Sequence, residues 1–171
     1  LLLKPGVEYK DAETLPSKWN SGKYDRNLAH LISKDKDGFI RFGGTPSDSS
    51  LHRFIDKCRE MGYKIMLYPM IMLDLEGKPW RGHITGSYKD VNNFFDKEHG
   101  YNDFIMHYAK TFGDKVDCLA IGSELKNITS IQENNHYIAV DNLISLAKNA
   151  KSFCKTLTYA ADWSEYHHDN I

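Results

Sequence analysis

Residues 116–125 read VDCLAIGSEL, an apolar run that ends in two small residues and a carboxylate. The continuous apolar segment Cys118 to Ile121 is typical of a parallel strand that is buried on both faces. Gly122 and Ser123 end this segment, and Glu124 follows at once. A buried carboxylate without a partner costs several kcal/mol. We therefore expect Glu124 to lie at the end of a strand, facing polar groups or a ligand.

Two interpretations of Glu124 follow from its position. It can cap or form a salt bridge with the next loop, which is a structural role. It can also belong to a catalytic or binding site, because such sites recur at the C-terminal ends of parallel strands. The spacing of this stretch alone leaves both interpretations open.

The composition indicates one globular domain. The chain has 171 residues, of which 41% are hydrophobic and 26% charged, close to the average of globular proteins. Its formal net charge of -1 gives no reason to expect nucleic acid as a partner. No apolar run approaches the length of a membrane span, and Leu1 to Leu3 are too short for the apolar core of a signal peptide. Cys58, Cys118 and Cys154 have no metal-site spacing, so we expect reduced thiols.

Strand-like and helix-like segments alternate along the chain. Strands are predicted at 39–42, 63–68, 116–122 and 156–161, and helices at 24–33, 49–60, 90–112 and 137–153, with a polar loop at 126–135. This order predicts an α/β fold with parallel strands and right-handed crossovers. An eight-stranded (β/α)8 TIM barrel takes roughly 250 residues. We therefore expect residues 1–171 to form a single domain that is the first part of such a barrel, about strands 1–5, incomplete at its C-terminus.

Aromatic and polar residues gather after the predicted strands. The candidate binding residues are Tyr68, Trp80, Arg81, His83, Asp162 and Trp163. The strands of a parallel barrel end at one rim, so these side chains are expected on the same side as Glu124. A Trp beside an Arg in a glycine-rich loop fits a binding surface, and it also fits a Trp that only packs the loop against the rim.

Two further motifs are weaker. Gly43 and Gly44 precede a predicted helix and could hold a phosphate, but the lysine and the spacing of a P-loop are missing. His167 and His168 are adjacent but lack further ligands, so no metal or other cofactor is predicted.

Six motifs in order carry a family resemblance. They are FGGTPSD at 42–48, YP at 68–69, PWRG at 79–82, HYA at 107–109, IGSEL at 121–125 and YAADWSEY at 159–166. Together they resemble the TIM-barrel-like domain of phage-tail proteins from gene transfer agents and related prophages. That domain is similar to retaining glycoside hydrolases of the endo-β-mannanase type. The resemblance covers the chain from Pro5 onward.

The resemblance implies a glycoside hydrolase-like domain that binds, and in the fuller hypothesis hydrolyses, a cell-surface or cell-wall glycan. Glu124 matches the general acid/base. Retaining hydrolysis needs a second carboxylate about 5–5.5 Å away, which in the family comes from strand seven; Asp162 and Glu165 are the nearby candidates here. The alternative is a non-catalytic baseplate or host-recognition module that contacts other tail subunits. Such a protein is expected in the bacterial cytoplasm when made, or in a phage-tail-like particle.

Overall fold

Three parallel strands form the centre of the fold. The computed structural model describes residues 48–71, 80–98 and 100–167. Within these ranges, β1 (Met66–Leu67), β2 (Cys118–Ser123) and β5 (Leu157–Ala160) form a sheet in the order β1-β2-β5. Both pairings are parallel, which confirms the predicted adjacency of these strands. The predicted strand 39–42, helix 24–33 and the Gly43-Gly44 turn lie outside the described residues.

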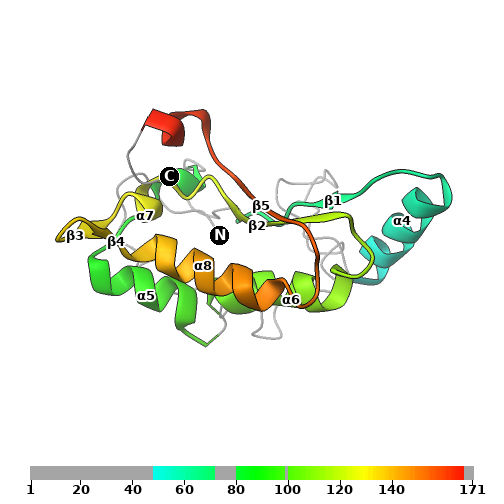
Figure 1. Cartoon of the computed structure of the whole chain (residues 1–171), viewed down its shortest axis with the longest axis horizontal. Coiled ribbons are helices and arrows are strands. Elements are labelled where there is room, and N and C mark those ends of the chain that lie inside the picture. Colours follow the sequence, from blue (N-terminus) through cyan, green and yellow to red (C-terminus); the bar gives the residue numbers. More distant parts are fainter. Residues whose placement is uncertain (1–47, 72–79, 99, 168–171) are drawn as a thin grey trace, which may run out of the picture.

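Four longer helices accompany the strands in the described part of the chain. They are α4 (Asp48–Glu60), α5 (Tyr88–Asp96), α6 (Tyr101–Phe112) and α8 (Ile138–Ala150). Figure 1 shows α5, α6 and α8 in one layer beneath the strands, and α8 packs against β2. In the chain, α5 and α6 lie between β1 and β2, and α8 lies between β2 and β5. Parallel strands with helices between them are the arrangement expected of part of a barrel.

The core lies between this helical layer and β2. Phe94 stacks on Tyr101 with ring centroids 5.1 Å apart, and Phe95 meets the same ring edge-on at 5.5 Å. Phe112 and Leu119 are fully buried. The four aromatic residues follow the helical spacing of apolar residues within segment 90–112, and Leu119 belongs to the apolar run of β2. Their burial fixes α5 and α6 against the strand that ends at Glu124.

Local signals set the helix ends. Helix α5 begins two residues before its predicted start, because Ser87 and Asp90 form a reciprocal capping box. At the end of α4, Gly62 has a φ of 80°, and the amide of Tyr63 donates to the carbonyl of Cys58 over 3.0 Å. Gly62 is therefore the left-handed residue that closes the helix.

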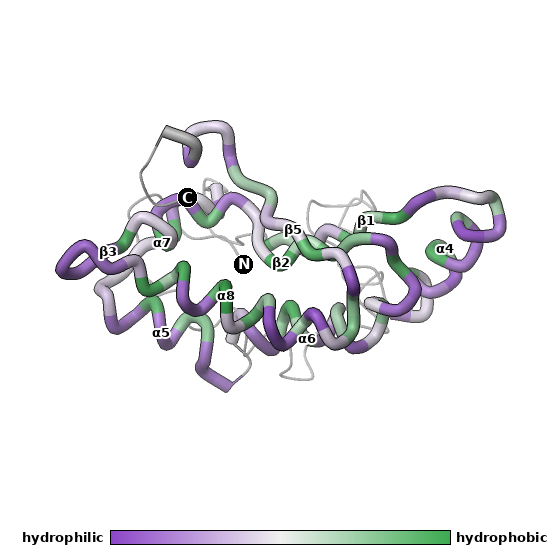
Figure 2. Tube along the Cα trace, viewed as in Figure 1, coloured by the Kyte–Doolittle hydropathy of each residue, from purple (hydrophilic) through white to green (hydrophobic). Residues whose placement is uncertain are grey.

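The segment after Glu124 differs from the polar loop that was predicted. It contains the short helix α7 (Lys126–Thr129) and a hairpin of β3 (Gln132–Glu133) and β4 (His136–Tyr137). Asn134 and Asn135 turn the hairpin with φ values of 51° and 61°. Asn tolerates this left-handed conformation, and two such residues make the turn that suits a two-residue hairpin. Figure 2 shows how hydrophilic this hairpin is.

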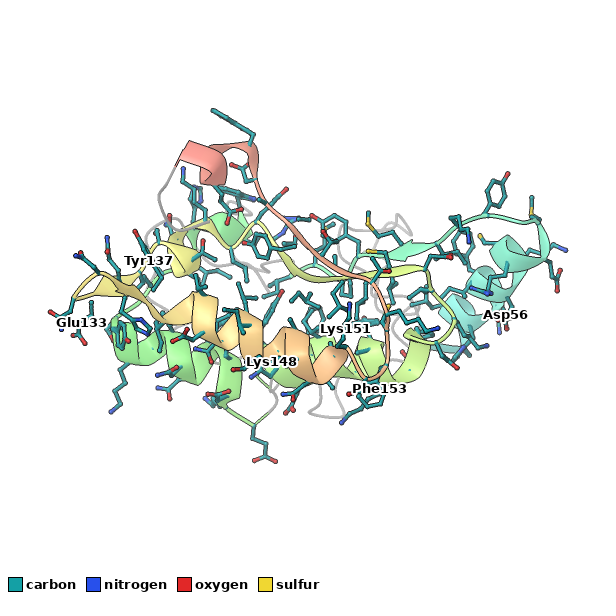
Figure 3. All side chains as sticks on the ribbon, in the orientation of Figure 1. Asp56, Glu133, Tyr137, Lys148, Lys151 and Phe153 are labelled. Carbon is teal, nitrogen blue, oxygen red and sulfur yellow. The ribbon has the colours of Figure 1, made fainter. Side chains whose placement is uncertain are left out.

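Helix α4 buries a narrower face than the spacing suggested. Apolar positions 51, 54, 55 and 58 predict one inward face. Ile55 is buried, but Phe54 is 67% exposed. Asp56, also on α4 (Figure 3), pairs with Lys115 at 2.9 Å ahead of β2. Among the described helices, none combines the length and the apolar character needed to cross a membrane.

Candidate functional site

Glu124 lies directly after β2 in an unusual backbone conformation. Its φ is 49°, in the left-handed region that L side chains other than Asn and Asp seldom adopt. Its amide donates to the carbonyl of Ala160 over 2.9 Å, which extends the pairing of β2 with β5 by one residue. The strand therefore ends in a sharp turn that carries the Glu124 side chain.

Two donors meet on one oxygen of the Glu124 carboxylate. The indole Nε1 of Trp80 donates to Oε2 over 2.6 Å, and Nη1 of Arg81 lies 3.3 Å from the same atom. The Glu124 side chain is 28% exposed and that of Arg81 13%, so solvent screens this pair only in part. Oε1 accepts no hydrogen bond from the residues described here. The structure thus brings three of the predicted site residues together.

Arg81 also connects the ends of two strands. Its Nε donates to the hydroxyl of Ser123 over 3.3 Å, and Nη2 lies 3.0 Å from the sulfur of Met70. The hydroxyl of Tyr68, just after β1, lies 2.7 Å from the same Ser123 oxygen. Tyr68, another predicted site residue, therefore reaches Arg81 through a single serine. This network orients the guanidinium toward Glu124.

Trp80 is held by the short 3-10 helix η1 (Arg81–His83) that follows it. A Cβ placed on Gly82 would lie 2.4 Å from the indole ring, so only glycine lets the ring approach the backbone this closely. The ring of His83 meets the indole edge-on at 5.4 Å. His83 Nδ1 is buried without a hydrogen-bond partner in this part of the structure. Packing therefore fixes the direction of the indole N–H.

Asp162 and Glu165, after β5, bond to groups other than the Glu124 carboxylate within the described part of the chain. Oδ2 of Asp162 accepts a hydrogen bond from the amide of Ser164 over 2.9 Å and another from its hydroxyl. The hydroxyl bond is the largest of the effects that lower the pKa of Asp162. Asp162 thus caps the 3-10 helix η2 (Trp163–His167). Trp163 is 74% exposed.

Glu165 is completely buried. Its Oε1 accepts from the hydroxyls of Tyr159, over 2.8 Å, and Thr129, over 3.2 Å. Its Oε2 accepts from the amide of Asp162 over 2.6 Å. Because donors occupy both oxygens, Glu165 has a structural environment rather than that of a reacting group.

Tyr159 is the residue of this region that the sequence interpretation did not single out. Its hydroxyl accepts from the amide of Leu125, next to Glu124, over 2.9 Å. Burial is the main reason that the pKa of Tyr159 is raised well above its ordinary value. Nothing in the sequence distinguished Tyr159 from a core tyrosine, because its partners lie on two other segments.

Comparison with known proteins supplies the family context. Residues 99–171 match the model of the GTA TIM-barrel-like domain. No curated protein matches the chain. The matched segment includes α6, β2, α8 and β5, and with them Glu124, whereas Trp80 and Arg81 precede it.

This match agrees with the observed architecture. The chain has a TIM-barrel-like α/β fold, and its three parallel strands are consistent with part of a barrel. The similarity to the GTA TIM-barrel-like domain covers residues 99–171. No group of three or more His, Cys, Asp or Glu within the described ranges is arranged to hold a metal ion.

Proposed function

We propose that this domain binds an oligosaccharide at the C-terminal ends of β1, β2 and β5, with Glu124, Trp80 and Arg81 at the centre of the site. The observation that carries the proposal is the convergence of an indole N–H and a guanidinium on one carboxylate oxygen. Among the described residues, nothing donates to the second oxygen of Glu124, which can accept hydrogen bonds from the hydroxyls of a ligand. Fixed polar groups of this kind set the orientation of a ligand.

The surrounding groups suit a sugar. The hydroxyls of Tyr68 and Ser123 can each donate and accept, which matches the alternating donors and acceptors of a carbohydrate. The largely exposed ring of Trp163 offers an apolar face beyond the end of β5, and aromatic faces pack well against the C–H faces of sugar rings. His83 adds a buried ring nitrogen beside Trp80.

Recognition fits these residues better than hydrolysis. Glu124 has the position of a general acid/base, but retaining hydrolysis also needs a nucleophile about 5–5.5 Å away. Asp162 is bound by Ser164, and Glu165 is bound by Tyr159 and the Asp162 amide. Neither carboxylate is therefore suited to act as the nucleophile. Hydrolysis would require a carboxylate from another part of the protein.

The family match supports a location in a gene transfer agent or phage-tail-like particle. There the site would contact a cell-surface or cell-wall glycan while neighbouring tail or baseplate subunits hold the domain. The second candidate is a purely structural module of the same particle. Glu124 favours recognition over this alternative, because both of its donors meet one carboxylate oxygen. Donors occupy both oxygens of the structural carboxylate Glu165.

The test combines a glycan array with an assay for reducing-sugar release. Trp80→Ala is expected to abolish binding, because it removes the group that orients Glu124. Glu124→Gln removes the charge at nearly constant shape; we expect weaker binding and no release from any variant. Glu133→Gln, on the exposed strand β3 of the hairpin (Figure 3), is the matched control and should bind as the unaltered protein does.

The alternatives give different results in the same experiment. Release by the unaltered protein that is lost in Glu124→Gln, with binding retained, would identify a hydrolase, because an amide cannot act as a general acid. Absence of binding to every glycan would overturn the proposal and leave the structural module.

A further inference from the structure

We propose that Tyr159 and Glu165 form a positioning pair that holds the Glu124–Leu125 peptide, and through it the Glu124 carboxylate, in place. The consequence for ligand binding rests on the function proposed above, but the positioning itself does not. Neither residue touches the Glu124 side chain in the structure. Both would act through the backbone.

The chain of contacts begins at the peptide after Glu124. The amide of Leu125 donates to the Tyr159 hydroxyl over 2.9 Å. This hydroxyl has a single proton, which it donates to Oε1 of Glu165 over 2.8 Å. The Tyr159 oxygen is thus both acceptor and donor, so its direction is determined from both sides.

Glu165 lies at the other end of this series of hydrogen bonds and is itself held in place. It is completely buried, and it also accepts from the amide of Asp162 and the hydroxyl of Thr129. These two partners belong to the turn after β5 and to α7. Because a buried carboxylate is costly unless donors satisfy it, the three segments stay together around Glu165.

The backbone at Glu124 is the reason that such support is needed. A left-handed conformation costs a residue with a side chain roughly 1–2 kcal/mol, and it persists only where the surroundings determine it. Here hydrogen bonds hold the peptides on both sides of Glu124, from its own amide to Ala160 and from Leu125 to Tyr159.

Gly122 makes the bond to Tyr159 sterically possible. A Cβ at Gly122 would lie 2.5 Å from the Tyr159 ring, and the register of β2 against β5 shifts between Ala120 and Gly122. The ring therefore lies over a glycine at the irregular end of the strand pair. This arrangement lets its hydroxyl reach the peptide after Glu124.

The indole resonance of Trp80 reports on the Glu124 carboxylate without any ligand. In the 15N-labelled chain, the Nε1–H signal, assigned with Trp80→Phe, should move in Glu124→Gln because its acceptor changes. We expect Tyr159→Phe to move it as well. Tyr108→Phe is the matched control, since Tyr108 is also buried but packs within α6 against Phe104 and Phe112. It should leave the Trp80 signal unchanged.

Glu165→Gln gives a second, smaller perturbation that keeps the side-chain volume, and it should also move the Trp80 signal. If Tyr159→Phe and Glu165→Gln both fold and leave this signal at its original position, the proposal is wrong. If neither variant folds, hydrogen exchange in the unaltered chain decides. Equal protection from hydrogen exchange at the Leu125 amide and the Trp80 indole would support the proposal, because both groups would then exchange through the same local unfolding. An indole that exchanges independently of Leu125 would overturn the proposal.

Failure of this proposal and failure of the proposed function are distinguishable. The resonance shifts require no glycan, so they test positioning alone. A protein that binds no glycan can still show the coupling between Tyr159 and Trp80, and a glycan-binding protein can lack it.

Discussion

The indole of Trp80 donates to Oε2 of Glu124 over 2.6 Å, although 44 positions separate the two residues in the chain. Arg81, next to Trp80, approaches the same oxygen. The carboxylate that ends β2 is therefore oriented by the segment between β1 and α5. This relationship makes the site a product of two chain segments, and it determines which substitutions will separate binding from folding.

Trp163→Ala should weaken glycan binding without destabilising the fold. Trp163 is 74% exposed, so we expect the free energy of unfolding to change by less than about 0.5 kcal/mol. Loss of one stacking face should reduce affinity roughly 2- to 12-fold, which corresponds to about 0.5–1.5 kcal/mol. Calorimetric titration and urea unfolding measure the two effects. Phe153→Ala, an exposed aromatic after α8, should leave the affinity unchanged; an equal loss in both variants would argue against a role for Trp163.

Glu124→Gly should be more stable than Glu124→Ala, by about 1 kcal/mol, because the φ of 49° is costly for a residue with a Cβ. Both variants lose the carboxylate, so the comparison isolates the backbone. At Lys148 in α8 (Figure 3), the order should be reversed, since glycine is less favourable than alanine in a helix by about 1 kcal/mol. Urea unfolding of the four variants checks both orders. Equal stability of the two Glu124 variants would mean that the left-handed conformation is not retained in solution.

Gly122→Ala should destabilise the protein by about 1–3 kcal/mol, because the new methyl group overlaps the Tyr159 ring. It should also change the near-ultraviolet circular dichroism of the tyrosines. Gly62→Ala is the control: no atom lies within 4 Å of its added Cβ, but its φ is 80°. That variant should show only the backbone cost of about 1–2 kcal/mol and an unchanged tyrosine spectrum. A tyrosine signal unaffected by Gly122→Ala would contradict the observed packing.

Stability should fall in acid partly through Asp117. The amide of Ile65 is the largest cause that lowers the pKa of Asp117, and a hydrogen bond from Lys64 adds to it. Since the pKa is lower in the folded state, this stabilisation is present above the unfolded value of about 3.9 and is lost as the pH falls through the folded pKa. Urea unfolding at neutral and at acid pH gives the loss of unfolding free energy on acidification. This loss should be smaller for Asp117→Asn than for the unaltered protein. Lys64→Met should reduce this loss less than Asp117→Asn does. A larger reduction in Lys64→Met would contradict the assignment of the effect to Asp117.

The sequence by itself predicted the strand order and its direction. Apolar runs such as Cys118 to Ile121, separated by segments with helical spacing, specify parallel strands with helices between them, because these patterns depend on local periodicity. The sequence also indicated that Glu124, Trp80 and Trp163 lie just after strands. It did not indicate the hairpin at 132–137, whose left-handed asparagines resembled an ordinary polar loop, or the exposure of Phe54.

The tertiary structure decided how these residues meet. Trp80 and Arg81 reach Glu124, whereas Asp162 turns back onto Ser164 and Trp163 is largely exposed. Tyr159 looked like a core residue, and its role depends on an amide 34 positions earlier. Hydrogen-bond partners of this kind depend on strand register, on a bulge at Gly122 and on a left-handed residue at Glu124. These features arise from long-range packing, which the periodicity of the sequence does not encode.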